Sequence, residues 1–334
     1  SGYETITNDL SGLDVAGITL IGAGTDNETF RISGNAITVS GPISGTQESG
    51  NLQLGIDVIL GADVTYSVPE NAVQFGVYGS TTKLNLDVND LTVSSAHVEC
   101  YPLSIFSSLD GSGFLTTSAG SGYLNLLAGA DGYTGNVSIN GKGLGLKADS
   151  LYAYSVVTMN NSSVLSFSVS SAATYDIEVV MNSDADPALL ASPLAAGSCS
   201  GGGSPVKSTT TVTGSLVLQR DTIFYGTNDL KFTGTYTSNG HNLSVKGGSE
   251  GVITTTSGAT QAPAETTTIE ESDKSPTTTV NIDFNQTTIV KGERGNIYVN
   301  NGGNLKGKGK VGVITTNGGT VSPGLSPRCI TSSG

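Results

Sequence analysis

The chain has no tryptophan and little positive charge: 15 Lys and Arg against 28 Asp and Glu among 334 residues, a net charge of −13 at pH 7. A protein that binds a nucleic-acid backbone needs a stripe of basic side chains, and this composition leaves none. Long apolar runs are also missing, because none approaches the roughly 20 residues of a membrane-spanning helix. We therefore expect neither a nucleic-acid partner nor a transmembrane segment.

Histidine and cysteine are scarce as well. His97 and His241 lie far apart in the sequence and supply too few ligands for a zinc site. The three cysteines, Cys100, Cys199 and Cys329, allow at most one intrachain disulfide. A Cys100–Cys199 bond would close a large loop, and unpaired buried thiols are the alternative. With that bond formed, Cys329 would remain as the odd thiol, able to bond to another copy.

The chain begins at Ser1, without an initiating Met and without a basic-then-apolar secretion signal. A mature exported protein and a trimmed chain would both begin in this way. The combination of few Lys, few Cys and many Ser, Thr and Asn favours a location outside the cytoplasm. We expect an extracellular or bacterial cell-surface location.

Glycine is abundant, with 46 residues, and Val, Ile, Leu, Ser, Thr and Asn fill most other positions. This composition is typical of β-rich proteins. Runs of three to six residues alternate apolar with polar, as at 36–39, 64–66 and 137–139, and Gly, Asn, Asp or Ser separate them. Only residues 184–197 begin like a helix, and Pro193 interrupts them. We predict an all-β protein.

Strand spacing decides between a sandwich, a barrel and a solenoid. Two Asn-Gly pairs, at 140–141 and 239–240, are candidate hairpin turns. By contrast, residues 111–151 repeat one short phrase of Gly, an apolar residue and a polar stretch, with looser echoes at 229–255 and 295–324. The repetition predicts a parallel β-solenoid with about 20 to 25 residues per coil, in which glycine permits the tight corners.

Two stretches interrupt the repetition. Residues 182–208 combine Pro, small residues and a Gly-Gly-Gly run, which is typical of a loop or linker. Residues 254–279 are rich in Thr, poor in large apolar residues and carry a small acidic cluster. We predict one solenoid segment over 1–181, a linker over 182–208, and a second segment over 209–334 with a disordered-like, Thr-rich excursion at 254–279.

The phrase at 111–151 resembles the passenger repeats of autotransporters, in particular the autotransporter-associated β-strand repeat. The residues that carry the resemblance are Gly111, Gly113, Tyr133, Thr134 and Gly135. The resemblance implies a right-handed parallel β-helix, export, and exposure on a bacterial surface.

The closing phrase Ser322-Pro323-Gly324 resembles the turn that ends many of these passengers. Arg328 and Cys329 depart from the family pattern, which has small residues there. Family members also carry a membrane β-barrel after the passenger, and none follows Gly334 in this sequence. A released passenger, a truncated chain and a relative without its own barrel remain open.

A polysaccharide-cleaving β-helix would need clustered carboxylates on one face. Asp110 and Asp131 lie one expected coil apart, yet each precedes a Gly, as Asp does in turns. Arg220-Asp221 could act as a catalytic pair, but a surface pair at a strand start explains it equally. We expect no catalytic residue.

Carboxylate and amide oxygens could hold calcium, although a role in polar loops explains them as well. The two candidate sets are Asp87, Asn89 and Asp90, and Asp184 with Asp186. We otherwise expect no cofactor.

These observations favour a non-catalytic surface scaffold of adhesin type that meets surface glycans, proteins or other copies of itself. The alternative is a structural subunit that assembles into a fibre or layer, because the strand edges at the ends of a parallel coil must be capped or joined. A β-helix polysaccharide lyase or hydrolase is the third and weakest hypothesis.

Overall fold

The fold was obtained as a computed structural model that describes most of the chain. The described residues are 3–20, 29–45, 51–67, 73–94, 103–130, 132–146, 155–168, 172–192, 208–246, 249–260, 265–282, 286–300, 302–323 and 331–332. These residues form strands and turns and contain no helix. No segment among them is therefore an apolar helix long enough to cross a bilayer.

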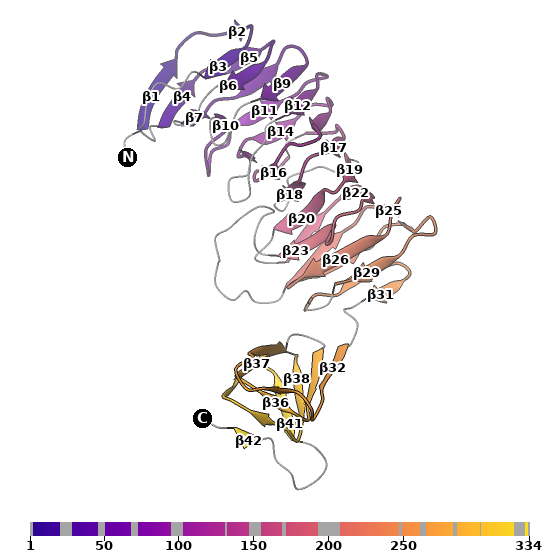
Figure 1. Cartoon of the computed structure of the whole chain (residues 1–334). Coiled ribbons are helices and arrows are strands. Elements are labelled where there is room, and N and C mark those ends of the chain that lie inside the picture. The colour runs from indigo at the N-terminus through magenta and orange to yellow at the C-terminus, as the bar shows by residue number, and fades with distance from the viewer. Residues whose placement is uncertain are drawn as a thin grey trace. The chain divides into compact units, whose positions relative to one another are not determined.

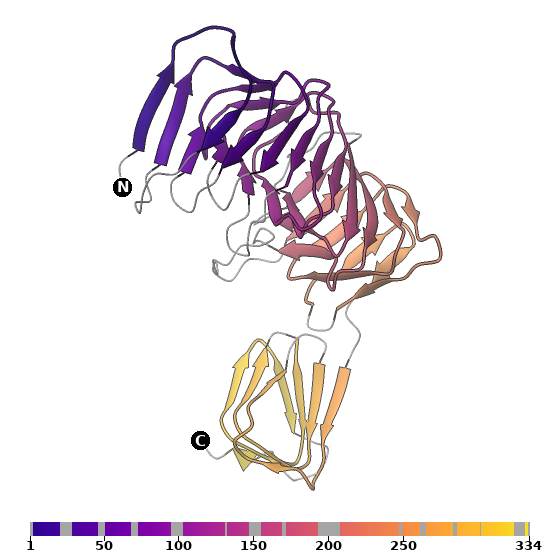
Figure 2. The same cartoon turned by 45° about the horizontal axis from the view of Figure 1, so that its top comes forward.

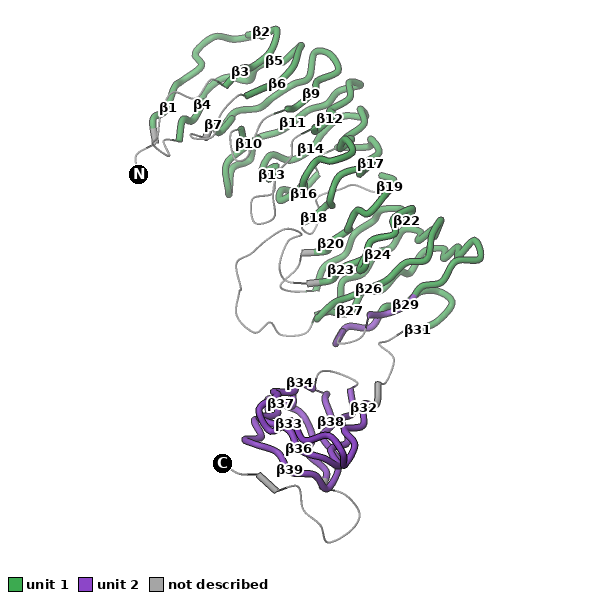
Figure 3. The backbone as a smooth tube through the Cα atoms, viewed as in Figure 1, with its two compact units in different colours: residues 1–243, 253–259 green, residues 244–252, 260–334 purple. Residues whose placement is uncertain are grey.

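The chain forms two compact units (Figure 3). Unit 1 comprises Ser1–Leu243 and Ile253–Ala259, and unit 2 comprises Ser244–Val252 and Thr260–Gly334. Both units are built from short strands stacked side by side (Figures 1 and 2).

Two sheets of unit 1 begin at the first coil and lie on adjacent sides of the stack. Sheet A has 11 strands: β1 (Tyr3–Asn8), β4 (Thr29–Gly34), β7 (Asn51–Leu54), β10 (Val73–Phe75), β13 (Leu103–Ile105), β16 (Tyr123–Leu126), β18 (Gly143–Leu146), β20 (Val164–Ser168), β23 (Leu189–Ser192), β26 (Thr222–Gly226) and β29 (Leu243–Val245). Sheet B has 5 strands: β2 (Leu13–Val15), β5 (Ile37–Val39), β8 (Val58–Leu60), β11 (Lys83–Asn85) and β14 (Ser108–Asp110).

Two further sheets complete unit 1. Sheet C has 10 strands: β3 (Ile18–Leu20), β6 (Ile43–Gly45), β9 (Val64–Ser67), β12 (Leu91–Val93), β15 (Leu115–Thr117), β17 (Val137–Ile139), β19 (Ser155–Asn161), β22 (Ile177–Ser183), β25 (Leu216–Leu218) and β28 (Tyr236–Thr237). Sheet D has 5 strands: β21 (Ala173–Tyr175), β24 (Thr209–Val212), β27 (Asp229–Phe232), β30 (Ile253–Thr255) and β31 (Gly258–Thr260).

The chain visits sheet A, then sheet B or D, then sheet C, and returns to sheet A one coil further on. Strands of neighbouring coils pair in parallel. For example, Phe30 pairs with Leu52, a spacing of 22 residues, and Leu124 pairs with Leu144, a spacing of 20. This confirms the predicted parallel β-solenoid and its coil length. The Asn-Gly pairs at 140–141 and 239–240 lie at corners between coils and not in antiparallel hairpins.

The core of unit 1 consists of columns of aliphatic side chains that stack from coil to coil. Along sheet C the column is Leu91, Leu115, Val137, Val157, Val179 and Leu216. Each of these side chains is at most 1% exposed. Complete burial of one such side chain is worth about 1.5–3 kcal/mol, so the columns are the main stabilising feature of the coil. Residues between them in each strand face outward, as the pleat requires.

Unit 2 is a second solenoid with shorter coils. Sheet E contains β32 (Glu265–Ile269), β35 (Gln286–Val290), β38 (Asn304–Gly307) and β41 (Thr320–Pro323); sheet F contains β33 (Lys274–Ser275), β36 (Glu293–Arg294), β39 (Lys310–Val311) and β42 (Thr331–Ser332); sheet G contains β34 (Val280–Ile282), β37 (Ile297–Asn300) and β40 (Ile314–Asn317). Val280 pairs with Ile297, and Ile297 with Ile314, each 17 residues on. The shorter coil encloses a smaller core around Val290, Val299 and Leu305.

The division into units differs from the segments expected from the sequence. Residues 182–192 are not linker but belong to β22 and β23, where Leu189 and Ala191 are fully buried. The rest of the expected linker up to 207 lies outside the described residues. The small residues that suggested a loop instead fill inward positions of the coil.

The expected Thr-rich excursion at 254–279 also contains strands. It includes most of β30, all of β31 and β32, and β33, and the units divide within and just before it. Thr-rich segments form strands readily because threonine is β-branched, and Ile269 supplies the buried anchor of β32 at 5% exposure.

Candidate binding surface on sheet C

The outer face of sheet C carries a row of hydroxyl side chains, one from each of five successive coils. We call this the hydroxyl row; it consists of Thr65, Thr92, Thr116, Ser138 and Thr158. All five are exposed or half-buried. Their backbones repeat about every 4.8 Å, so the row forms a regular ladder of hydrogen-bonding groups.

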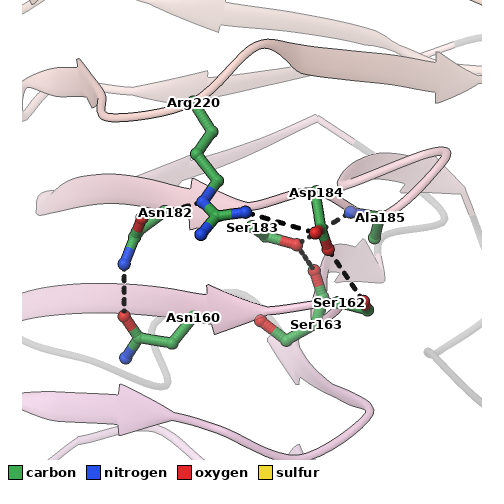
Figure 4. Close-up of polar contacts among 8 residues, drawn as sticks. All are labelled: Asn160, Ser162, Ser163, Asn182, Ser183, Asp184, Ala185 and Arg220. Atoms are coloured by element: carbon green, nitrogen blue, oxygen red, sulfur yellow. Dashed lines mark hydrogen bonds and ion pairs between the residues drawn. The ribbon is translucent and has the colours of Figure 1, made fainter.

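A second, hydrogen-bonded ladder follows at the ends of these strands (Figure 4). Asn182 Nδ2 donates to Asn160 Oδ1 at 3.1 Å, and Asn160 Nδ2 donates to Ser138 Oγ at 3.3 Å. Arg220 Nε donates to Asn182 Oδ1 at 3.2 Å. The ladder therefore runs through four coils and fixes the amide groups in one direction.

Asp184 lies at the edge of this ladder (Figure 4). Its carboxylate accepts hydrogen bonds from Ser162 Oγ at 2.7 Å and from an Arg220 terminal nitrogen at 3.2 Å. The side chains of Arg220 and Asp184 are 50% and 55% exposed, so the pair contributes little to stability. It instead leaves guanidinium and carboxylate groups in reach of a ligand. Ser183 Oγ, which donates to the Ser163 carbonyl at 2.6 Å, fixes the backbone beneath.

Arg220 and Asp221 do not form the pair considered from the sequence. Arg220 pairs with Asp184, whereas Asp221 Oδ1 accepts the Asn242 N–H at 2.9 Å and lies 3.5 Å from His241 Nδ1. The backbone hydrogen bond from Asn242, together with nearby His241, lowers the pKa of Asp221.

Many acidic side chains of unit 1 hold consecutive coils together. Asp63 Oδ1 accepts the N–H of Asp90 at 2.9 Å, and Asp90 Oδ1 accepts the N–H of Phe114 at 2.8 Å. Each donor lies just before or at a sheet C strand one coil further on. Asn136 bonds Val156 N–H in the same way at 3.1 Å. We call these bonds inter-coil Asx bonds; others involve Asp57 with Lys83, Asp221 with Asn242 and, in unit 2, Asn296 with Val313.

The first expected calcium set does not converge on one point. Asp90 is engaged with Phe114, Asn89 Nδ2 donates to the Leu60 carbonyl at 2.7 Å, and Asp87 occupies a turn with φ of 53°. Within the described ranges, no three His, Cys, Asp or Glu side chains gather as a metal site.

The expected carboxylate pair and the second calcium set fare as follows. Asp110 Oδ1 accepts the Gly111 N–H at 2.8 Å, which is the turn role anticipated for it. Asp184 is engaged with Ser162 and Arg220, and Asp186 precedes a cis-proline. Asp131, His97 and the three cysteines Cys100, Cys199 and Cys329 lie outside the described residues, so the disulfide stays a prediction.

The glycine and tyrosine residues of the repeat phrase come together at one corner of unit 1. The N–H of Thr134 donates to the Gly111 carbonyl one coil below at 2.8 Å. A Cβ on Gly113 would lie 1.7 Å from the Asn89 carbonyl oxygen, and one on Gly135 would lie 2.1 Å from that of Gly113. Neither position can accept a side chain, because the backbones of three coils are in close contact there.

Tyr133 lies in the interior beside this corner. It is fully buried, and its hydroxyl donates to the Asn136 carbonyl at 2.9 Å. Burial raises the pKa of this phenol well above its ordinary value.

The closing phrase lies in unit 2 and differs from the expected turn. Ser322 and Pro323 belong to β41, where they pair with Lys306 and Gly307. Proline fits there because β41 is the last strand of sheet E, and an edge strand tolerates the missing N–H. Gly324 lies outside the described residues.

Unit 2 uses ion pairs between coils. Lys291 Nζ lies 3.2 Å from Glu270, Lys274 Nζ lies 3.2 Å from Glu293, and Arg294 contacts Asp273 directly. The hydrogen bond from Arg294 lowers the pKa of Asp273 to about 2. These pairs were not anticipated from the sequence, where the acidic cluster of 270–273 suggested a solvated loop.

A scan against family models, a search of curated proteins and a search of solved structures each found no match to this chain. The autotransporter resemblance therefore stays a prediction that rests on the quoted motifs.

We predict that Gly113→Ala destabilises unit 1 by about 3 kcal/mol, because the new Cβ overlaps a carbonyl oxygen. Gly120→Ala is the matched control. Gly120 has φ of 84° and open space around it, so only backbone strain of about 1 kcal/mol applies. Urea unfolding followed by circular dichroism measures both, and equal costs would contradict the close stacking.

We predict that Asp90→Ala costs about 1 kcal/mol, because it removes the acceptor of the Phe114 N–H. Asp90→Asn keeps a side-chain oxygen and should unfold like the parent chain, since Asn136 already makes the same bond. The same urea titration compares the two variants. Equal loss in both would show that charge, and not the inter-coil hydrogen bond, matters at this position.

Proposed function

We propose that this chain is a non-catalytic surface scaffold of adhesin type, exported to the outside of a bacterial cell. In this proposal the outer face of sheet C contacts surface glycans or proteins. The observation that carries it is the hydroxyl row, which repeats on five coils beside the Asn160–Asn182–Arg220 ladder.

The chemistry of this face suits an extended, polar partner. Hydroxyl and amide groups both donate and accept, so they match the hydroxyls of a glycan or the edge of a peptide. Their spacing is set by backbone pairing and not by flexible loops, so little side-chain freedom is lost on binding. Several weak contacts in a row then add up along the axis.

The fate of the acidic residues supports a non-catalytic role. Asp63, Asp90 and Asp221 each accept a backbone N–H from the next coil. A general acid or base must have its oxygens free to reach a substrate. The acidic composition is thereby explained in large part by corner geometry.

The test is binding of the purified chain to a glycan array and to immobilised extracellular-matrix proteins. We expect at least one probe to be bound, and we expect Thr92→Arg combined with Thr116→Arg to weaken that binding about tenfold or more, because two long cations disrupt the hydroxyl row. The matched control is Thr267→Arg with Thr315→Arg, which places the same charges on exposed strand positions of unit 2.

Absence of binding to every probe would count against the adhesin proposal. Equal binding by the sheet C variant and the parent chain would remove sheet C as the surface.

The second candidate is a subunit that assembles end to end, and the first coil of unit 1 favours it. Ile6 and Leu10 are 59% and 58% exposed there, and Leu13 and Ile18 are only half-buried. One coil further in, the equivalent Ile37 and Ile43 are buried. An exposed apolar coil with free strand edges can pair with another copy.

Light scattering from about 1 to 100 µM distinguishes this candidate, since association across that range corresponds to micromolar affinity. Assembly predicts a mass that rises with concentration and falls back to the monomer in Ile6→Lys with Leu10→Lys. Val88→Lys, at a 72% exposed position, is the control. A constant monomer mass for the parent chain would reject assembly.

A further inference from the structure

A shallow cavity of about 340 Å³ lies at the corner between sheets A and B. Three successive coils line it: Tyr78, Gly79 and Ser80 after β10, Phe106 after β13, and residues 127–129 after β16. The volume is at the lower end of the range for small-molecule sites, about 300–1,000 Å³. This corner is separate from sheet C, so a ligand here would add a function to the proposed one.

Two aromatic rings form the wall of the cavity. Tyr78 is 82% exposed, the largest value among the large hydrophobic side chains of the described residues. Its ring packs edge-to-face on Phe106, with centroids 6.3 Å apart and planes at 87°. Holding an aromatic ring in water is unfavourable, and the contact with Phe106 fixes its orientation.

A chain of hydroxyl groups leads from the cavity into the protein. Ser80 Oγ lies 2.9 Å from Thr82 Oγ1, which lies 3.0 Å from Ser107 Oγ. Ser107 is only 2% exposed, so the inner end of the chain is shielded from water. Hydroxyls can turn to donate or accept, so Ser80 can adjust to a hydroxyl-bearing ligand.

None of the lining residues is charged, although unit 1 has 7 Lys and Arg against 21 Asp and Glu, a net charge of −14. An anionic ligand would approach against this field, and a cationic one would find no carboxylate in the cavity. The lining therefore favours a neutral ligand with an apolar face and a hydroxyl edge.

We propose that this cavity binds one ring of a neutral sugar. The C–H face of the ring would pack on Tyr78, and its hydroxyls would bond Ser80 and the backbone of Gly79. A proline-rich peptide also packs on aromatic grooves, but it would leave the Ser80–Thr82–Ser107 hydroxyls without a ligand hydroxyl to bond.

The test is saturation-transfer NMR of the full chain with methyl glycosides of glucose, galactose, mannose and N-acetylglucosamine. We expect at least one to bind, and we expect Tyr78→Ala to weaken it about tenfold, since one stacked ring is lost. Tyr78→Phe keeps the ring and should bind as the parent does. Phe114→Ala, at a 49% exposed aromatic of unit 1, is the control for non-specific contact.

Because Tyr78 is mostly exposed, Tyr78→Ala should melt like the parent chain, and circular dichroism checks this. The proposal is overturned if no neutral glycoside binds, if Tyr78→Ala binds unchanged, or if methyl glucuronide or a proline decamer binds more tightly through Tyr78. Thr92→Arg with Thr116→Arg should leave glycoside binding intact. Loss there would place the sugar on sheet C, which would support the proposed function and contradict this site.

Discussion

Parallel hydrogen bonding between one coil and the next is the constraint on which the rest of this structure depends. It places each residue above its equivalent in the coil below, as in the column from Leu91 to Leu216. An inward position must therefore be apolar in every coil, and an outward position forms a row. The aliphatic core and the hydroxyl row are two consequences of the same register.

Corners are where this register is hardest to maintain, because successive backbones converge there. Gly113 and Gly135 permit contact distances that no side chain would tolerate. Asp63 and Asp90 bond the N–H groups that begin the next coil. The acidic and glycine-rich composition is thus largely a property of corners. It leaves the strand faces free for threonine, serine and asparagine, and it is on those faces and beside one corner that we place binding.

Strand content, parallel stacking and coil length could be predicted from the sequence because they follow from alternation and repetition. Ser138, Asn160 and Asn182 recur at a spacing of 22 residues, so their ladder was also within reach. The strands of 254–279 were missed because threonine and ion pairs replace most large apolar residues there. The cavity could not be predicted, because the irregular coil that pairs Phe75 with Ile105, 30 residues on, hides the proximity of Tyr78 and Phe106.

The most direct test of the parallel register is the distance between spin labels placed along the outer row of sheet C, after the three native cysteines are replaced by serine. Thr65 and Thr158 lie four coils apart, and Thr65 and Thr237 lie seven coils apart. At about 4.8 Å per coil, pulsed electron resonance should give backbone separations of about 19 and 34 Å. Distances that do not increase with the number of coils would contradict the stacked register and the binding surfaces derived from it.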